Sequence, residues 1–315
     1  MVSVPNQSNK SGNKIGVIDL GTNTFHLLIA SYDDQGWHEV QRLRRFVALG
    51  EEGIDTLGEQ ALARAYSALQ EFKDILLQQE VKMYQVHGTA ALRTASNGAQ
   101  FIKQVKENLE MNIQIIGGDQ EALLIYEGVR QAITDMKSPH LIMDIGGGSV
   151  EFIIGDQQRL LWAQSFPIGV AVLYQRFHHS DPIRASEIKD TEDYLQSVFQ
   201  SIREALRKYP CENLIGASGT FDVLERLLPA EPVGDHAAKI SVSDFYPLYN
   251  EFIQSDLAAR MNWPGLPAQR AQLIIVALIL INQAITLQPF QNIYISKFAM
   301  KEGMIAQLLK KVRHA

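Results

Sequence analysis

The sequence predicts an α/β protein of two domains, each built on a mixed β-sheet flanked by helices, with a cleft between them. Three observations predict this fold. A glycine-rich turn between two apolar runs occurs twice, each copy opens one half of the chain, and helical and strand patterns alternate after each copy. With 315 residues the chain is long enough for two ordinary domains.

The clearer copy of the turn spans residues 141–155, which read LIMDIGGGSVEFIIG. Asp144 ends one apolar run, glycines occupy 146–148, and Ser149 precedes a second apolar run that contains Glu151. We interpret the segment as two strands joined by a tight turn. Glycine permits left-handed dihedrals and a close approach to a ligand. Amide groups gathered at such a turn suit an anionic oxygen.

The other copy spans residues 15–30, which read IGVIDLGTNTFHLLIA. At a constant offset, Asp19 aligns with Asp144, Gly21 with Gly146 and Thr24 with Ser149. A single glycine-rich turn is weak evidence, because most such glycines only shape a turn. Two copies with the same order of Asp, Gly and hydroxyl residue indicate two related halves, each presenting a phosphate loop.

The first half begins with a three-strand meander and continues with alternating helices and strands. Strands are expected at Ile15–Leu20, Phe25–Tyr32, Trp37–Leu49, Lys82–Val86 and Ile113–Ile116. Helices are expected at Leu57–Glu80, at Ala99–Leu109 after a possible N-cap at Asn97, and from Asp119 or Gln120 to Ile133.

The second half repeats this order after a link near Thr134–Pro139. Strands are expected at His140–Asp144, Val150–Gly155, Gln158–Ser165, Asn213–Ala217 and Asn292–Ser296. Helices are expected at Gly169–Phe177, Ala185–Lys208, Thr220–Leu228, 243–260 and 267–286, and from Phe298. Residues 229–242 contain Pro and Gly and predict a loop. The domains are therefore residues 14–134 and 135–315, preceded by a flexible leader at 1–13; the helix at 298–313 is a candidate to pack back on the N-terminal domain.

Composition excludes several classes of protein. A net charge of −6 argues against a broad nucleic-acid surface, which needs clustered positive charge. The most membrane-like run, residues 273–281, is far shorter than the roughly 20 apolar residues of a span, so we expect a buried helix and no membrane association. Cys211, the one cysteine, excludes an internal disulfide and is consistent with the cytoplasm.

Seven segments together resemble the exopolyphosphatase and guanosine pentaphosphate phosphatase family. They are IDLGTNTFHLLI, GTAALRTASNG, GGDQEALLIYEGV, DIGGGSVEFIIG, SFPIGVAVLYQRF, GASGTFDVL and KEGMI, in this order along nearly the whole chain. The resemblance implies two actin-like (ribonuclease H-like) domains with mixed five-stranded sheets and an active-site cleft between them. It also implies hydrolysis of phosphoanhydride bonds in the presence of Mg²⁺ or another divalent cation.

The resemblance indicates Glu121 and Arg93 as catalytic residues. Glu121 opens a helix, where a carboxylate is common merely because it favours the helix dipole. As a catalytic residue it would orient a water and take its proton, and a bound phosphate would raise its pKa. Arg93 follows a strand and a small-residue turn, where a planar guanidinium could hold two phosphate oxygens.

The loops supply the candidate binding residues. We expect one phosphate to be held by Gly21, Thr22, Asn23 and Thr24, another by Gly146, Gly147, Gly148 and Ser149, and a third at a strand-to-helix join by Gly216, Gly219 and Thr220. Asp144 and Glu151 are metal candidates, as is Asp19, which could equally anchor its own turn. His26 is interpreted as a packed or hydrogen-bonded residue rather than a catalytic one. Lys301 could reach the cleft, but we interpret it as part of a solvated face.

The chain departs from the family pattern at three positions. Gln120 replaces an acidic residue, Val150 stands where the family often has Thr, and Gln272 replaces an Asp. The chain also stops before an additional C-terminal helical domain found in long members. The leading hypothesis is release of terminal orthophosphate from inorganic polyphosphate. Hydrolysis of guanosine pentaphosphate is the alternative. A kinase would need a pocket for a second substrate, and no motif for such a pocket is visible. The three departures are also compatible with a non-catalytic phosphate or nucleotide sensor. The partner is thus polyphosphate or a phosphorylated guanine nucleotide, and the resemblance makes a homodimer plausible.

Overall fold

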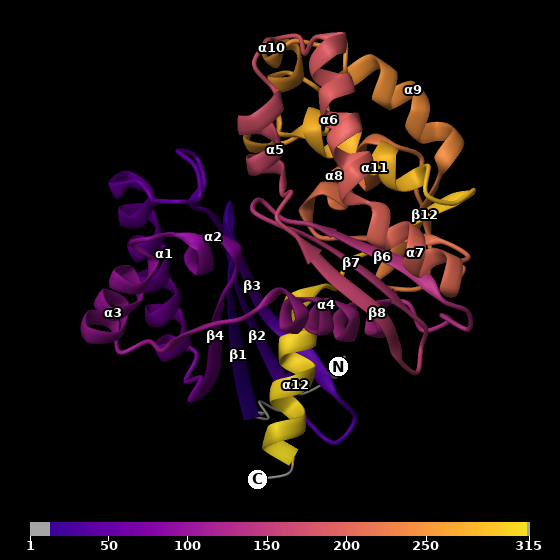
Figure 1. Ribbon diagram of the computed structural model, residues 1–315. Coiled ribbons are helices and arrows are strands. Elements are labelled where there is room, and N and C mark those ends of the chain that lie inside the picture. The colour runs from indigo at the N-terminus through magenta and orange to yellow at the C-terminus, as the bar shows by residue number, and fades with distance from the viewer. Residues whose placement is uncertain (1–12, 314–315) are drawn as a thin grey trace, which may run out of the picture.

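The computed structural model describes residues 13–313, so the predicted leader lies almost entirely outside the described residues. Two mixed sheets face each other, and the last helix of each half lies between them (Figure 1). The predicted fold class is confirmed. The first sheet has five strands, as expected, and the second has seven because a hairpin extends it.

The first sheet has the order β3-β2-β1-β4-β5. β1, β2 and β3 form the antiparallel meander, and β4 and β5 add in parallel beyond β1. Its strands are β1 (Asn13–Leu20), β2 (Thr24–Tyr32), β3 (Trp37–Phe46), β4 (Met83–Gly88) and β5 (Ile113–Ile115); its helices are α1 (Glu59–Gln78), α2 (Ala90–Thr94), α3 (Gly98–Leu109) and α4 (Gly118–Ala132).

The second sheet repeats this order as β8-β7-β6-β9-β12 and continues through β11 to β10. Its strands are β6 (His140–Ile145), β7 (Val150–Gly155), β8 (Leu160–Phe166), β9 (Leu214–Ala217), β10 (Glu231–Pro232), β11 (Ala237–Ser241) and β12 (Asn292–Ser296). The helices are α5 (Val170–Phe177), α6 (Ala185–Val198), α7 (Gln200–Lys208), α8 (Gly219–Leu227), α9 (Val242–Phe252), α10 (Leu257–Met261), the 3-10 helix η1 (Ala268–Arg270), α11 (Ile274–Ile285) and α12 (Met300–Arg313).

Some predicted bounds are wrong. The expected loop at 229–242 contains β11, which pairs with β12 far along the chain and buries Ala237, Ala238 and Ile240. Two alanines and one isoleucine give too weak a strand pattern to be recognised without that partner. The expected helix at 185–208 is divided at Phe199, which ends α6 and caps α7.

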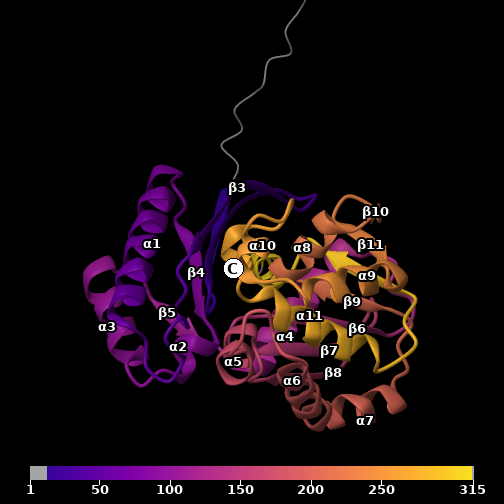
Figure 2. The same ribbon diagram turned by 90° about the horizontal axis from the view of Figure 1, so that it is seen from above.

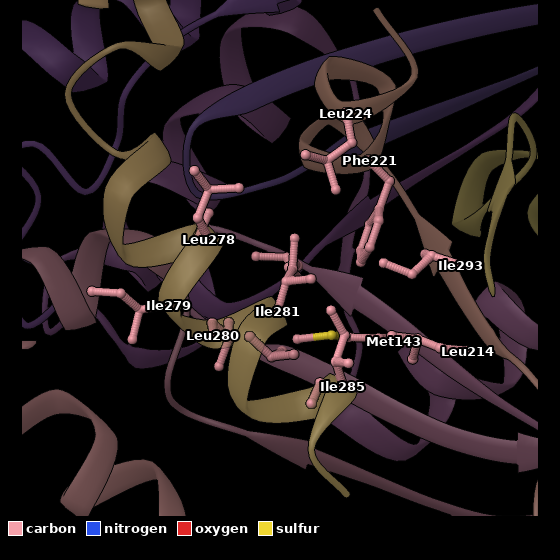
Figure 3. Close-up of a cluster of buried hydrophobic side chains, with 14 of the residues drawn as sticks. Met143, Leu214, Phe221, Leu224, Leu278, Ile279, Leu280, Ile281, Ile285 and Ile293 are labelled. Atoms are coloured by element: carbon pink, nitrogen blue, oxygen red, sulfur yellow. The ribbon is translucent and has the colours of Figure 1, made fainter. Parts of the chain in front are cut away.

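Three apolar clusters hold the structure together. Helices α1 and α3 cover the outer face of the first sheet, as Figure 2 shows from above. Helix α11 is buried on nearly every side (Figure 3), where its side chains meet Met143, Leu214 and Phe221. This explains the apolar run at 273–281. Within residues 13–313, none of the helices combines the length and the apolar character that crossing a membrane requires.

The third cluster joins the two sheets through α4 and α12. The helices cross so closely that a Cβ at Gly128 would lie 1.9 Å from the carbonyl oxygen of Ala299, and a Cβ at Gly303 would lie 1.9 Å from that of Leu124. α12 packs on β1 and β2, whereas α4 packs on β7 and β8. Each half therefore supplies its final helix to the sheet of the other half, and the start of α12 crosses the middle of α4.

Candidate active site

The two glycine-rich turns have the same backbone geometry. The amide of Gly21 donates to the carbonyl of Thr24 at 3.2 Å, and the amide of Gly146 donates to that of Ser149 at 3.0 Å. The expectation of left-handed glycines is wrong here, since the glycines with positive φ within residues 13–313 are Gly36, Gly53, Gly234 and Gly265. The turns need glycine for space instead.

The need for space arises because the two turns touch. A Cβ at Gly147 would lie 2.7 Å from Nδ2 of Asn23, and a Cβ at Gly148 would lie 2.8 Å from Oγ1 of Thr22. Real Cβ atoms essentially never approach other heavy atoms so closely. The duplicated segments, far apart in the sequence, thus face each other across a single site.

A cavity of about 370 Å³ lies between them. The turns contribute every loop residue that the sequence predicts, and α4, α8 and α12 contribute their first turns. Among the residues that line it are Asp19, Gly21, Thr22, Asn23, Thr24, Glu121, Asp144, Gly146, Gly147, Gly148, Ser149, Glu151 and Gly219.

Five carboxylates line this cavity, those of Asp19, Glu121, Asp144, Glu151 and Asp222. Burial, opposed by Lys301 and reinforced by Asp144, raises the pKa of Asp19 to about 7. Burial and then Asp144 raise the pKa of Glu151 to about 7, although hydroxyls of Ser165 and Ser149 act in the opposite direction. Burial also raises the pKa of Asp144. Burial thus disfavours the charged forms of these three carboxylates.

Glu121 lies in the first turn of α4 with 8% of its surface exposed. Burial, followed by repulsion from Glu151 and Asp19, raises its pKa well above the ordinary value. Oε2 of Glu121 is buried and has no hydrogen-bond partner among residues 13–313. It lies 3.5 Å from Nη1 of Arg93, which is close enough for an ion pair only. A buried acceptor without a donor is costly, so this oxygen suits a bound water.

Arg93 lies on the other side of Glu121. Its Nη1 donates to the carbonyl of Ile116 at 2.6 Å, just before α4 begins. The guanidinium lines a second cavity rather than the first. The two expected catalytic residues are therefore neighbours, but Glu121 lines the first cavity and Arg93 lines the second.

A cluster of basic side chains also lines the first cavity. Arg42, Arg44, Arg270, Lys297 and Lys301 line it. Burial, and then repulsion from Arg44, lowers the pKa of Arg270 to about 10, with Asp222 acting in the other direction. The guanidinium of Arg270 lies against α8, because a Cβ at Gly219 would lie 2.3 Å from its Nη2.

Sequence reasoning missed Arg270 and placed Lys301 on a solvated face. Neither residue belongs to a glycine-rich motif, and folding brings both to the cavity. The neighbouring residue Glu302 is fully buried and anchors the first turn of α12, which carries Lys301. The Glu302 carboxylate accepts a hydrogen bond from the amide of Ala299 at 2.7 Å and forms an ion pair with Nη1 of Arg42 at 2.7 Å. The KEGMI motif, which begins at Lys301, was the available signal. His26 also lines the cavity, and burial lowers its pKa.

Only one residue of the expected third phosphate site lines the cavity. Gly219 does so at the start of α8, whereas Gly216 packs beneath Phe221, whose ring carbon would lie 2.0 Å from a Cβ at that position. Thr220 is buried and does not line it. Gly216 therefore has a packing role that its motif alone did not reveal.

The metal candidates lie at neighbouring positions. Asp144 and Glu151 are directly opposite each other on β6 and β7, and Asp19 lines the same cavity from β1. Within residues 13–313, no three His, Cys, Asp or Glu side chains are arranged to hold a metal by themselves. Mg²⁺ commonly takes one or two carboxylates and completes its shell with water and substrate phosphate, so the donor set fits this ion.

Comparison with known proteins identifies the family. The description "Ppx/GppA phosphatase family" matches residues 28–312. A guanosine-5'-triphosphate,3'-diphosphate pyrophosphatase from Photobacterium profundum is 27% identical over 94% of this chain, which spans 59% of that protein's length. An exopolyphosphatase from Cytophaga hutchinsonii is 35% identical, with 95% of this chain and 98% of that chain covered and a TM-score of 0.89.

A member of the family from Aquifex aeolicus has the same fold, with 22% identity, 95% and 98% coverage and a TM-score of 0.79. Both the family match and the Cytophaga structure extend over nearly the whole chain. The chain therefore belongs to the Ppx/GppA phosphatase family.

Proposed function

We propose that the protein is a phosphohydrolase that removes terminal orthophosphate from inorganic polyphosphate. The observation that carries the proposal is the shared cavity, where two glycine turns meet beside a buried carboxylate oxygen that has no donor among the described residues. Amide groups of the turns would hold adjacent phosphoryl units. Glu121 would orient the water that attacks the outermost phosphorus.

The electrostatics support this chemistry. The raised pKa of Glu121 brings it closer to working pH, where a carboxylate is an effective proton acceptor. The carboxylate would take a proton from water as the new P–O bond forms and the bridging P–O bond breaks. Arg93 would hold the start of α4 through Ile116 and neutralise charge on the transferred group.

Asp144 and Glu151, with Asp19 beside them, would hold Mg²⁺ or another divalent cation together with substrate oxygens. When bound, the ion would neutralise phosphate charge and the repulsion among these carboxylates. This assignment deepens the phosphatase proposal without changing the role of Glu121.

The basic cluster of the cavity favours an extended polyanion. Arg44, Arg270 and Lys301 line the cavity together with Glu121 and could hold phosphoryl units behind the terminal one. The higher identity and near-complete coverage of the Cytophaga exopolyphosphatase also favour polyphosphate. Guanosine pentaphosphate is the second candidate, which the name of the Photobacterium relative favours.

We also propose that residues 14–134 and 135–315 act as two domains and that the protein works in the cytoplasm. Burial raises the pKa of the Cys211 thiol to about 12, which supports an unreactive structural thiol. A homodimer is expected from family resemblance; sedimentation analysis checks it.

The test is a panel of polyphosphates of several lengths, guanosine pentaphosphate and ATP, each incubated with the protein and Mg²⁺. We expect the highest rate of orthophosphate release with polyphosphate. Faster release from guanosine pentaphosphate would reverse the order of the two substrates. Tight binding of polyphosphate without release of orthophosphate would contradict the proposal that the protein is an enzyme and would favour a sensor.

A further inference from the structure

A second cavity, of about 400 Å³, is lined by Arg93 and by Gly148 and Ser149 of the second glycine turn, but not by Glu121. It is bounded by α2, by the start of α4 and by β8, through residues such as Arg93, Thr94, Gly118, Gln164 and Ser165. Thr94 and Asp119 are exposed and line it, so the cavity reaches the surface.

The two cavities share a thin wall. Ala90, Gly148 and Ser149 line both of them. Two side-chain pairs form the rest of the division: Glu121 faces the first cavity while Arg93, 3.5 Å away, faces the second.

The other pair is Glu151 and Ser165. Glu151 faces the first cavity, and Ser165, whose hydroxyl donates to Oε1 of Glu151 at 2.6 Å, faces the second. Glu121 and Glu151, which line the first cavity, are thus each in contact with a residue that lines the second, Arg93 and Ser165 respectively. The Ser165 hydroxyl uses its one donor on Glu151, whereas Arg93 keeps further N–H donors beside the one that Ile116 accepts, and an orthophosphate oxygen can accept these.

The charges of the two cavities differ. Arg44, Arg270 and Lys301 give the first cavity a basic cluster that suits a long anion. The second has one cationic residue, Arg93, and one acidic residue, Asp119. It could pass a small anion without retaining it.

We infer that the second cavity is the exit site of inorganic orthophosphate, separate from the cavity that holds the substrate chain. The inference rests on the proposed function. In an in-line displacement the water attacks opposite the bridging oxygen, so the new P–O bond lies on the side away from the remaining chain. Glu121 marks that side, and its neighbour Arg93 lines the second cavity. Orthophosphate can therefore leave past Arg93 while the shortened chain stays on the basic residues.

The experiment narrows the second cavity without touching the first. Thr94→Trp and Gln164→Trp, alone and combined, place a bulky ring at residues that line only the second cavity. Gln100→Trp, at an exposed position on α3, is the matched control. Thermal unfolding of each variant verifies that it folds. Orthophosphate release from long-chain polyphosphate is followed in the first turnover and at steady state, and chain lengths are resolved on gels.

We expect wild type and the control to shorten each chain through many turnovers without releasing it. The double variant should keep its first-turnover rate but release orthophosphate about tenfold more slowly at steady state, because product release becomes limiting. Intermediate chain lengths should then accumulate, since orthophosphate must leave by the entrance of the chain. A folded double variant with the steady-state rate and length distribution of wild type would overturn the inference. Failure of the wild type to release orthophosphate at all would instead refute the proposed function, and the exit site with it.

Discussion

Gly147 of the second glycine turn lies directly against Asn23 of the first, so closely that a Cβ on Gly147 would lie 2.7 Å from the side-chain nitrogen of Asn23. This relationship fixes the separation of the two turns. It also gives the glycine a role that the backbone dihedrals do not, because its φ is not in the left-handed region. Any side chain at this position must move one turn away from the other.

Gly147→Ala should therefore weaken both activity and stability. The added methyl overpacks the junction, which typically costs about 1–3 kcal/mol in the free energy of unfolding. Displaced amides would no longer match adjacent phosphoryl groups, so the orthophosphate release rate should fall as well. Urea unfolding and a phosphate-release assay measure the two effects. Gly117→Ala is the control, because that position has open space and a φ of −76°; equal behaviour of the two variants would contradict the interpretation.

Arg93→Ala should lower kcat by about a hundredfold, the usual effect of losing one donor at a developing charge. Arg93→Lys should restore only part of the rate, because an ammonium group cannot hold Ile116 and a phosphate oxygen with one planar fork. Arg130→Lys, which alters a pair with Glu127 outside both cavities, is the matched control. A fully active Arg93→Ala variant would show that the guanidinium has no part in the reaction.

The pH dependence of stability should change in Asp19→Asn. In the native state the pKa of Asp19 is raised from 3.8 to about 7, so the unfolded chain releases this proton first as pH rises. The contribution is absent below pH 4 and destabilises the native state progressively from pH 4 to 7, by about 4 kcal/mol at most. Urea unfolding at pH 5 and pH 8 should show a smaller loss of stability for Asp19→Asn than for wild type.

Asp135→Asn, which removes an exposed carboxylate, should keep the pH dependence of wild type. If Asp19→Asn and wild type lost the same free energy of unfolding between pH 5 and pH 8, the pKa of Asp19 would not be raised in the native state.

Mg²⁺ together with a non-hydrolysable diphosphate analogue should raise the unfolding temperature of the wild type more than either does alone. The ion relieves repulsion among Asp19, Asp144 and Glu151, and ligand binding to the native state stabilises it. Asp144→Asn should lose the additional increase because it lacks a candidate ligand. An undiminished increase in Asp144→Asn would exclude that residue as a ligand. Differential scanning fluorimetry measures both.

The sequence predicted what repeats locally. The duplicated order of Asp, Gly and hydroxyl residue around Asp19 and Asp144 located both hairpins, and the alternating apolar runs identified most strands of both sheets. The long apolar run at 273–281 was correctly interpreted as a buried helix, since it was too short to cross a membrane. These features depend on neighbours in the chain.

Features that depend on distant contacts were not predictable. Arg270 reaches the cavity because η1 lies beside the start of α8, and Lys301 does so because Glu302 fixes the first turn of α12 against β3. Gly216 belongs to a motif that resembles a phosphate site, yet it makes room for Phe221. The contact between Asn23 and Gly147 likewise exists only once the halves are packed together.

In the proposed reaction Glu121 directs water at a phosphoryl group held between the two turns. The most direct measurement is orthophosphate release from polyphosphate by Glu121→Gln, with binding of the polymer measured in parallel and Glu127→Gln, which removes a carboxylate on the same helix outside both cavities, as control. The account predicts a loss of at least about 10²-fold in rate for Glu121→Gln with binding retained, the usual effect of a lost general base, and an unchanged rate for Glu127→Gln. Equal rates for Glu121→Gln and wild type would contradict it.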